Sequence, residues 1–297
     1  MVTMVSASER RRLEEQLAGR RVLITGAARG IGASLARRLH GRGARVALLG
    51  LEPELLEQVA TVCGGAPWRV CDVRDRAQTA ASVAALVDEL GGLDVVVVNA
   101  GVAAQLPLLG GDPAVMDRTV EVNLLGTYAT VRAAGPYVAH PGGYALLVAS
   151  AAAGVQLPML GAYSASKAAV EALGNTLRIE TRHLGMRVGV AYLAEIDTDM
   201  TAIGFGTAAA RSVRKLGPFT RVAPLSVAVD AFERGIARRR RRVYAPRWVA
   251  TTMRLRMLVQ RLIELRPQPR LAQALDVART EHARLTTELP DRAGEAE

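Results

Sequence analysis

Residues 21–32 read RVLITGAARGIG, an apolar run that passes without a break into a glycine-rich turn. The first five residues are mostly apolar and β-branched, which predicts a short buried strand. The pattern from Ala33 to about His40 is rich in Ala, Leu and Arg and predicts a helix that Gly41 and Gly43 would end. A glycine turn between a strand and a helix brings backbone N–H groups and the positive helix end to a pyrophosphate.

Apolar segments and helical patterns alternate along the rest of the chain. About seven strands are expected, near residues 21–25, 45–49, 67–71, 94–98, 144–149, 187–193 and 242–245. This alternation is typical of an α/β fold: a Rossmann-type doubly wound parallel sheet with helices on both faces. We expect this domain at residues 20–248, an N-terminal extension at 1–19, and a basic amphipathic helix with a polar C-terminal tail at 249–297.

A second pattern that carries chemistry joins Ser150, Tyr163 and Lys167. On a helix, Tyr163 and Lys167 stand at i and i+4 and lie on one face. A nearby cation favours the phenolate, so Lys167 is expected to lower the pKa of Tyr163 below the ordinary value of about 10. Ser150 could then hydrogen-bond the carbonyl or alcohol oxygen on which the proton transfer occurs. Taken alone, the pair would more often be a core tyrosine and a solvated lysine.

The glycine spacing at residues 25–32 is T-G-x-x-x-G-x-G, which differs from the dinucleotide fingerprint of ordinary Rossmann proteins. It resembles the turn of the classical short-chain dehydrogenases/reductases, and the resemblance covers about residues 20–200. It implies reversible hydride transfer between a nicotinamide cofactor and a carbonyl compound or secondary alcohol. Tyr163 would be the general acid or base, Lys167 would also bind the nicotinamide ribose, and Ser150 would orient the substrate oxygen.

The resemblance carries over further residues one by one. Asn123 matches a helix Asn that holds a proton-relay water near the catalytic lysine, and it completes the catalytic set. Asp72 follows the third strand, where the family's Asp contacts the adenine ring, and Asn99-Ala100-Gly101 matches the family's N-A-G. The implied cofactor-binding residues are Gly26, Arg29, Gly30, Ile31, Gly32, Asp72, Val73, Asn99, Ala100, Gly101, Tyr163, Lys167, Ile196 and Thr198.

One departure from the family pattern lies after the sixth strand. Leu193-Ala194 stand where the family has Pro-Gly, while Ile196 and the carboxamide-binding Thr198 remain in place. Without Gly the backbone loses easy access to positive φ, and without Pro it loses a fixed φ. We therefore expect a reshaped nicotinamide loop in an active enzyme.

The segment near 199–224 corresponds to the family's substrate lid. Its apolar Met200, Ile203 and Phe205 could line a pocket for a hydrophobic molecule, or they could pack the lid onto the body of the domain. Both alternatives stay open at this point.

Three residues bear on whether the bound cofactor carries a 2′-phosphate or a free 2′-hydroxyl. Gly50 stands at the end of the second strand, where relatives that prefer NAD have an Asp for the ribose hydroxyls. Arg29 could meet a 2′-phosphate, and Glu52 lies close enough to replace the missing Asp. The pattern favours NADP, with NAD as the alternative.

Composition is typical of a cytoplasmic enzyme from a GC-rich bacterial genome, since arginine is abundant and lysine nearly absent. Two cysteines, Cys63 and Cys71, argue against a disulfide framework. The four histidines form no ligand cluster, so no metal is expected, and the sequence has no apolar run of about 20 residues. Family precedent suggests a homo-oligomer that acts on a small molecule.

Residues 238–270 hold eleven arginines and a single acid, Glu264, so this segment carries a net charge equal to the +10 of the whole chain. We weigh three roles: a solvated face that docks on its own or a sister subunit, peripheral association with anionic membrane lipids at the inner membrane surface, and nucleic-acid binding. No reader module accompanies the arginines, so nucleic acid is not expected as a partner. Two rival functions are a catalytically lapsed dinucleotide-binding scaffold or redox sensor, and a membrane-surface protein that uses the fold.

Overall fold

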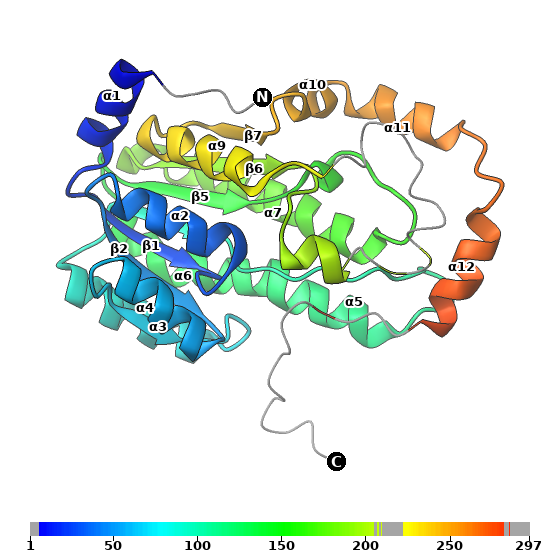
Figure 1. The fold of residues 1–297 in the computed structure, drawn as a ribbon, viewed down its shortest axis with the longest axis horizontal. Helices are drawn as coiled ribbons and strands as arrows, with labels where there is room; N and C mark the ends of the chain where they lie inside the picture. Colours follow the sequence, from blue (N-terminus) through cyan, green and yellow to red (C-terminus); the bar gives the residue numbers. More distant parts are fainter. Residues whose placement is uncertain (1–5, 205–206, 208, 210–221, 282–284, 286–297) are drawn as a thin grey trace, which may run out of the picture.

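A single sheet of seven parallel strands organises the protein in the computed structural model, which describes residues 6–204, 207, 209, 222–281 and 285 (Figure 1). The strand order is β3-β2-β1-β4-β5-β6-β7, so the direction of strand addition reverses between β1 and β4. In such sheets, ligands bind outside the carboxyl ends of the strands at this switch point. The strands are β1 (Arg21–Thr25), β2 (Arg45–Gly50), β3 (Trp68–Val70), β4 (Val95–Val98), β5 (Tyr144–Val148), β6 (Arg187–Leu193) and β7 (Arg242–Ala245).

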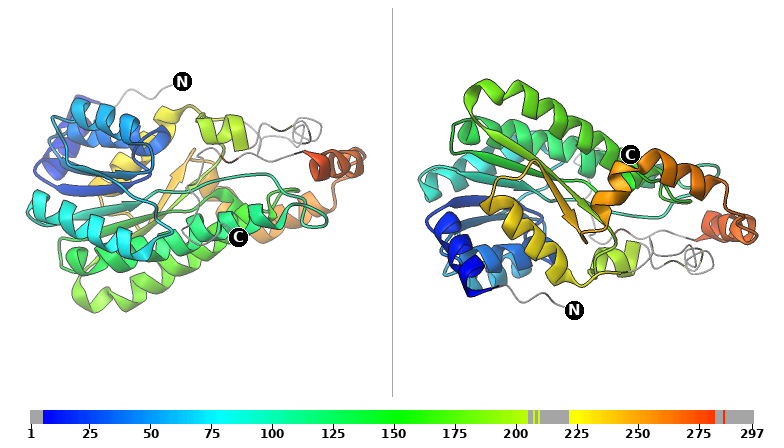
Figure 2. Two further views of the ribbon diagram at one scale, coloured as in Figure 1. Left: turned by 90° about the horizontal axis from the view of Figure 1, so that it is seen from below. Right: turned by 90° about the horizontal axis from the view of Figure 1, so that it is seen from above.

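Helices cover both faces of the sheet, as Figure 2 shows from two sides. One face packs against α1 (Ala7–Leu17), α2 (Gly30–His40), α3 (Pro53–Val62) and α9 (Leu225–Ala237). The other packs against α4 (Arg76–Leu90), α6 (Thr127–Val138), α7 (Gly161–Glu180) and α10 (Val249–Arg254). The remaining helical elements are α5 (Pro113–Val120), η1 (Glu121–Gly126), η2 (Ala151–Ala153), η3 (Arg182–Leu184), η4 (Met200–Gly204), α11 (Arg256–Glu264) and α12 (Leu271–Thr280). This arrangement confirms the predicted doubly wound fold.

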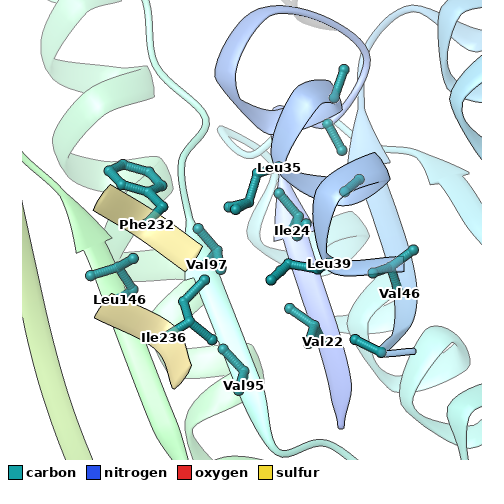
Figure 3. Packing of buried hydrophobic residues seen from close by; sticks show 14 of the residues in the cluster. Val22, Ile24, Leu35, Leu39, Val46, Val95, Val97, Leu146, Phe232 and Ile236 are labelled. Atoms are coloured by element: carbon teal, nitrogen blue, oxygen red, sulfur yellow. The ribbon is translucent and has the colours of Figure 1, made fainter. Parts of the chain in front are cut away.

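The alternation of buried side chains explains why the centres of the strands are apolar on both sides. Val22 and Ile24 of β1 enter one core, while Leu23 between them enters the other. Helices cover a parallel sheet on both faces, so consecutive residues in the buried part of a strand are apolar. In Figure 3, side chains of α2 and α9, such as Leu39 and Phe232, meet the strand side chains of the first core.

Residues 6–19, expected to precede the domain as an extension, pack onto it. Ser6 caps α1 by accepting a hydrogen bond from the backbone N–H of Glu9. Leu13 and Leu17 are each 1% exposed and belong to the first core. The amphipathic pattern in this polar stretch thus anchors the segment to α9.

The C-terminal region forms separate helices. The basic amphipathic helix expected at the start of residues 249–297 divides at Leu255 into α10 and α11, and α12 follows within the expected polar tail. The run Arg238–Arg242 lies at the start of β7, whereas α10 and α11 follow the opposite end of that strand (Figure 1). The basic segment is therefore two separate clusters. Within the described residues, no helix is both long enough and apolar enough to cross a membrane.

Candidate active site

The glycine turn has the geometry that a pyrophosphate requires. Gly26 has φ +63° and Gly30 has φ +55°, values that side-chain-bearing residues rarely adopt. A Cβ on Gly32 would lie 2.1 Å from the carbonyl oxygen of Gly26, so only glycine lets α2 start this close to β1. Together these glycines leave the N-terminus of the 11-residue helix α2 open to an anion.

Thr25 connects the glycine turn to the end of β4 through hydrogen bonds. In the sequence analysis this residue is predicted only as part of a strand. Its hydroxyl accepts hydrogen bonds from the backbone N–H groups of Asn99 and Ala100, each at 3.0 Å. The Asn99 side chain in turn donates to the carbonyls of Thr25 (3.0 Å) and Gly26 (3.2 Å). The first letter of the T-G-x-x-x-G-x-G spacing was the signal that could have identified it.

Two neighbouring cavities follow the predicted dinucleotide path along the carboxyl edge of the sheet. The first has a volume of about 120 Å³, and the predicted residues in its wall are Gly26, Arg29, Gly30, Ile31, Asn99, Ala100, Gly101 and Thr198. The second, of about 70 Å³, also includes Asp72 and Val73. Asp72 accepts hydrogen bonds from the backbone N–H and the Nε of Arg74, at 2.9 and 2.8 Å, which fixes its carboxylate beside the cavity.

Arg29 and Glu52 meet at the place where the 2′ position of the cofactor is expected. The Arg29 guanidinium lies 2.5 Å from a Glu52 carboxylate oxygen, and 3.9 Å from Asp199. Both Arg29 and Glu52 line the first cavity. The arginine chosen from the sequence as a phosphate ligand is thus already engaged by acidic side chains.

The catalytic set converges at the N-terminal half of α7. Ser150 follows β5, and its Oγ donates to the Leu193 carbonyl (3.2 Å) and accepts from the Ala152 N–H (3.1 Å). The Ser150 side chain also forms a hydrogen bond with Tyr163. Lys167 donates from Nζ to the Val148 carbonyl (3.0 Å), and this Nζ lies 5.7 Å from the centre of the Tyr163 ring.

Burial shifts the pKa of both titrating groups. Desolvation raises the pKa of Tyr163 above its ordinary value, and the hydrogen bond with Ser150 acts in the opposite direction. Desolvation lowers the pKa of Lys167 to about 8. The expected lowering of the Tyr163 pKa by Lys167 is therefore absent from this structure, since the buried phenol favours its neutral form.

Asn123 lies in the π-helical segment η1 and is fully buried. Its Oδ1 accepts from the Val102 N–H (2.8 Å), and its Nδ2 donates to the Val102 carbonyl and to Ser166 Oγ, each at 3.0 Å. Ser166 Oγ donates to the Tyr163 carbonyl (2.8 Å). A Cβ on Gly101 would lie 3.0 Å from Asn123 Oδ1 and 3.3 Å from Lys167 Nζ, so the predicted residues meet here.

The loop after β6, where Leu193-Ala194 stand in place of Pro-Gly, is held by contacts of Ile196. Ile196 is 4% exposed and pairs with Ala223 as an isolated bridge. The Ile196 carbonyl accepts from Thr198 Oγ1 (3.3 Å) and Thr201 Oγ1 (2.5 Å). Of the predicted lid near 199–224, the structure describes residues 199–204, 207, 209 and 222–224; Phe205 lies outside the described residues.

The candidate substrate pocket, with a volume of about 110 Å³, is lined by Ser150 and Tyr163. Ile31, Thr198 and Met200 line both this pocket and the first dinucleotide cavity, so the two spaces meet at these residues. The pocket wall also includes Trp248, which precedes α10, and Thr252 within α10; neither was predicted as a site residue. No local motif marks them, because their position depends on the length of β7 and the following turn.

The described residues hold no group of three His, Cys, Asp or Glu side chains that could bind a metal ion. The glycine turn, the neighbouring cavities and the Ser150–Tyr163–Lys167 set are the features expected of a nicotinamide-dependent oxidoreductase. The chain belongs to the short chain dehydrogenase family, whose model matches residues 20–208.

Individual relatives agree with this assignment. The chain is 34% identical to a D-threitol dehydrogenase of Mycolicibacterium smegmatis, over 70% of this chain and 82% of the relative. It is 36% identical to an NAD-dependent oxidoreductase of Mycobacterium tuberculosis, over 62% of this chain and 74% of the relative. The crystal structure of a levodione reductase matches with a TM-score of 0.68 at 25% identity, over 74% of this chain and 91% of that one.

Proposed function

We propose that this oxidoreductase interconverts a hydrophobic secondary alcohol and the corresponding carbonyl compound. The observation that carries the proposal is the position of Ser150 and Tyr163 in one pocket wall, at the junction with the dinucleotide cavity. The rest of that wall is largely apolar and includes Leu157, Met200 and Trp248. An apolar pocket with a few polar groups at one point suits a ligand with one reacting oxygen.

When bound, the nicotinamide cofactor would supply or accept the hydride. Gly26, Gly30 and the N-terminus of α2 would hold its pyrophosphate, because positive φ and the close approach of α2 to β1 leave room for it. Lys167 would bind the nicotinamide ribose hydroxyls, and Thr198 lies where the two cavities meet, next to the nicotinamide position.

Tyr163 would move the proton. Its phenol O–H would donate to the carbonyl oxygen during reduction, and its phenolate would accept the proton of the alcohol during oxidation. Burial raises the pKa of Tyr163, so its phenol is neutral in this structure, the form that donates a proton in reduction. Ser150 would orient the substrate oxygen through the hydroxyl that already contacts Tyr163.

Asn123 would complete a proton relay. Its side chain is held by Val102 and Ser166, so we propose that its backbone carbonyl, in the π-helical turn, would hold the relay water. The intact set of Ser150, Tyr163 and Lys167 argues against a lapsed scaffold or redox sensor.

We also propose that NAD, the alternative cofactor in the sequence analysis, is preferred over NADP. Glu52 engages the Arg29 guanidinium, and a 2′-phosphate would have to displace this carboxylate. A ribose with free hydroxyls would instead find a carboxylate acceptor at that place, as in NAD-binding Rossmann folds. The name of the Mycobacterium tuberculosis relative includes NAD dependence, in line with this proposal.

A screen of secondary alcohols and ketones with NAD(H) and NADP(H) tests the proposed function. Turnover of at least one apolar compound, with better kcat/KM than polar compounds of the same size, is expected. Turnover restricted to polyols or sugars would contradict the hydrophobic substrate. We further propose a homo-oligomer, which light scattering would test, and a cytoplasmic location, which suits the two free, buried thiols Cys63 and Cys71.

Peripheral membrane association is a second candidate that one surface favours. Leu255, Leu258, Leu262 and Leu265 share one face at α11 and are 49–67% exposed. Exposed arginines border this stripe at positions 254, 261 and 266. An apolar stripe between cations suits an anionic lipid surface. In the run Arg238–Arg242, the Arg238 guanidinium pairs with Glu9, and no apolar stripe accompanies these arginines in the described part of the chain.

Co-sedimentation with anionic vesicles tests this second candidate. Replacement of Leu258 and Leu262 by Ser should release the protein from vesicles, whereas replacement of Arg241 by Gln should not. Equal vesicle binding by both variants would contradict a role for α11, and the absence of vesicle binding at low salt would end the membrane hypothesis.

A further inference from the structure

A second, larger cavity lies on the other side of the loop at residues 156–161. Its volume is about 560 Å³, within the range that holds whole ligands in other proteins. Segments far apart in the sequence enclose it: the loop at 107–109, the loop at 156–161, the first half of α7, and α12. Neither the predicted catalytic residues nor the dinucleotide cavities account for this space.

The wall of this cavity is mainly apolar, with Leu108 and Leu109 on one side and Leu271 and Leu275 of α12 on another. Leu108 and Leu109 are 71% and 80% exposed, which is unusual for two adjacent leucines in a loop. Arg279 holds α12 at the cavity by donating from Nε to the Leu109 carbonyl at 3.1 Å.

One polar side chain in the wall points to a ligand. Ser164 is 3% exposed, and its Oγ has no hydrogen-bond partner among the described residues. Buried hydroxyls rarely stay without a partner. An oxygen on a bound molecule would supply that partner.

The cavity adjoins the substrate pocket. Leu157 lines both spaces and is only half-buried, so its side chain is the partition between them. Tyr163 faces the substrate pocket, and Ser164, the next residue of α7, lines the second cavity. A molecule that reacts at Tyr163 could therefore extend past Leu157 toward Ser164.

We infer that the second cavity holds the tail of the enzyme's own substrate, a linear aliphatic chain that carries an oxygen function within reach of Ser164. This inference rests on the proposed function, because it assigns the reacting end of the same molecule to Tyr163. It specifies the substrate class as a long-chain secondary alcohol or ketone with an ester, ether or hydroxyl oxygen in its tail.

Calorimetric binding of 2-butanone and 2-dodecanone to the protein with bound oxidised cofactor, which cannot reduce a ketone, tests the aliphatic part. Each buried methylene adds about fourfold to affinity, so 2-dodecanone should bind at least about a hundredfold more tightly. Leu275→Trp should lower the affinity for 2-dodecanone at least about tenfold and change the affinity for 2-butanone by no more than about twofold. Leu265→Trp, the same change on an exposed leucine outside the cavity, should change neither affinity.

Ser164→Ala tests the oxygen contact. The wild type should bind methyl 10-oxoundecanoate more tightly than 2-dodecanone by about two- to tenfold, the range of one neutral hydrogen bond. The variant should lose that preference. Equal affinities in the wild type, or an unchanged preference in the variant, would overturn the role of Ser164.

Failure of this inference is distinguishable from failure of the proposed function. If Leu275→Trp changes the oligomer mass and leaves the affinity for 2-dodecanone intact, the cavity face is an interface between copies, and the inference is wrong. If the ketones bind with the expected dependence on length but are not reduced with either cofactor, the cavity assignment stands and the proposed reaction is wrong.

Discussion

Glu52→Gln should shift the cofactor preference toward NADPH. The change removes the charge that engages Arg29 at 2.5 Å but keeps the size of the side chain. The Arg29 guanidinium then becomes available to a 2′-phosphate. A charge-assisted hydrogen bond contributes about 1.5–3 kcal/mol, which corresponds to an affinity gain of about 10- to 150-fold for NADPH.

The affinity of Glu52→Gln for NADH should fall, because a carboxylate acceptor for the ribose hydroxyls is lost. Calorimetric titration with both reduced cofactors measures the two changes. Glu54→Gln is a matched control, since Glu54 lies in the first turn of the same helix and is exposed. If the wild type already binds NADPH more tightly than NADH, and Glu52→Gln leaves the ratio unchanged, the assignment of Glu52 to the ribose is wrong.

Two further substitutions test the turn and the buried lysine. Gly32→Ala places a Cβ 2.1 Å from the Gly26 carbonyl oxygen. The variant should lose at least about 1–3 kcal/mol of stability in denaturation experiments and should not bind the cofactor in calorimetry. A variant with native stability and cofactor affinity would contradict the close packing. The pKa of Lys167 falls from 10.5 to about 8 on burial, so the folded state binds fewer protons than the unfolded state between these values. Stability of the wild type relative to Lys167→Met should therefore rise with pH across that window, by up to about 3 kcal/mol. Urea denaturation of both proteins at pH 7 and pH 10 would reveal it, and a constant difference would mean that the ammonium is not desolvated.

The sheet could be predicted from the sequence because most strands are apolar along their central positions and are bounded by glycine or polar residues. The predicted strand near 144–149 and the observed β5 (Tyr144–Val148) differ by one residue. The third strand, predicted at 67–71, contains only Trp68–Val70, since Arg69 and Val70 are exposed at the sheet edge and pair on one side only.

The residues around the predicted catalytic centre could be placed from the sequence because they belong to local motifs. Helical spacing alone brings Tyr163 and Lys167 together, and parallel strands carry Ser150 to the same edge. The pKa of Tyr163 could not be predicted in this way, because its direction depends on burial by distant segments. Likewise, the pair of Arg29 with Glu52 joins side chains from different βα units, and its geometry is set by tertiary packing.

The contact of α12 with the loop at 107–109 illustrates the limit of sequence patterns. Arg279 and the Leu109 carbonyl are 170 positions apart, and neither belongs to a motif. A polar tail with a weak helical pattern gives no indication of what it covers. The second cavity and its unpartnered Ser164 hydroxyl therefore became visible only in the folded protein.

Turnover by Tyr163→Phe, measured beside its cofactor affinity, tests the central claim most directly. The variant lacks only the phenol oxygen that would exchange the proton. Hydride transfer should fall by about 10²- to 10⁴-fold, the contribution of a positioned general acid or base. Cofactor affinity should stay within a few-fold, because the glycine turn and Lys167 hold the dinucleotide. Near-native turnover of an accepted substrate by Tyr163→Phe would contradict the assigned chemistry.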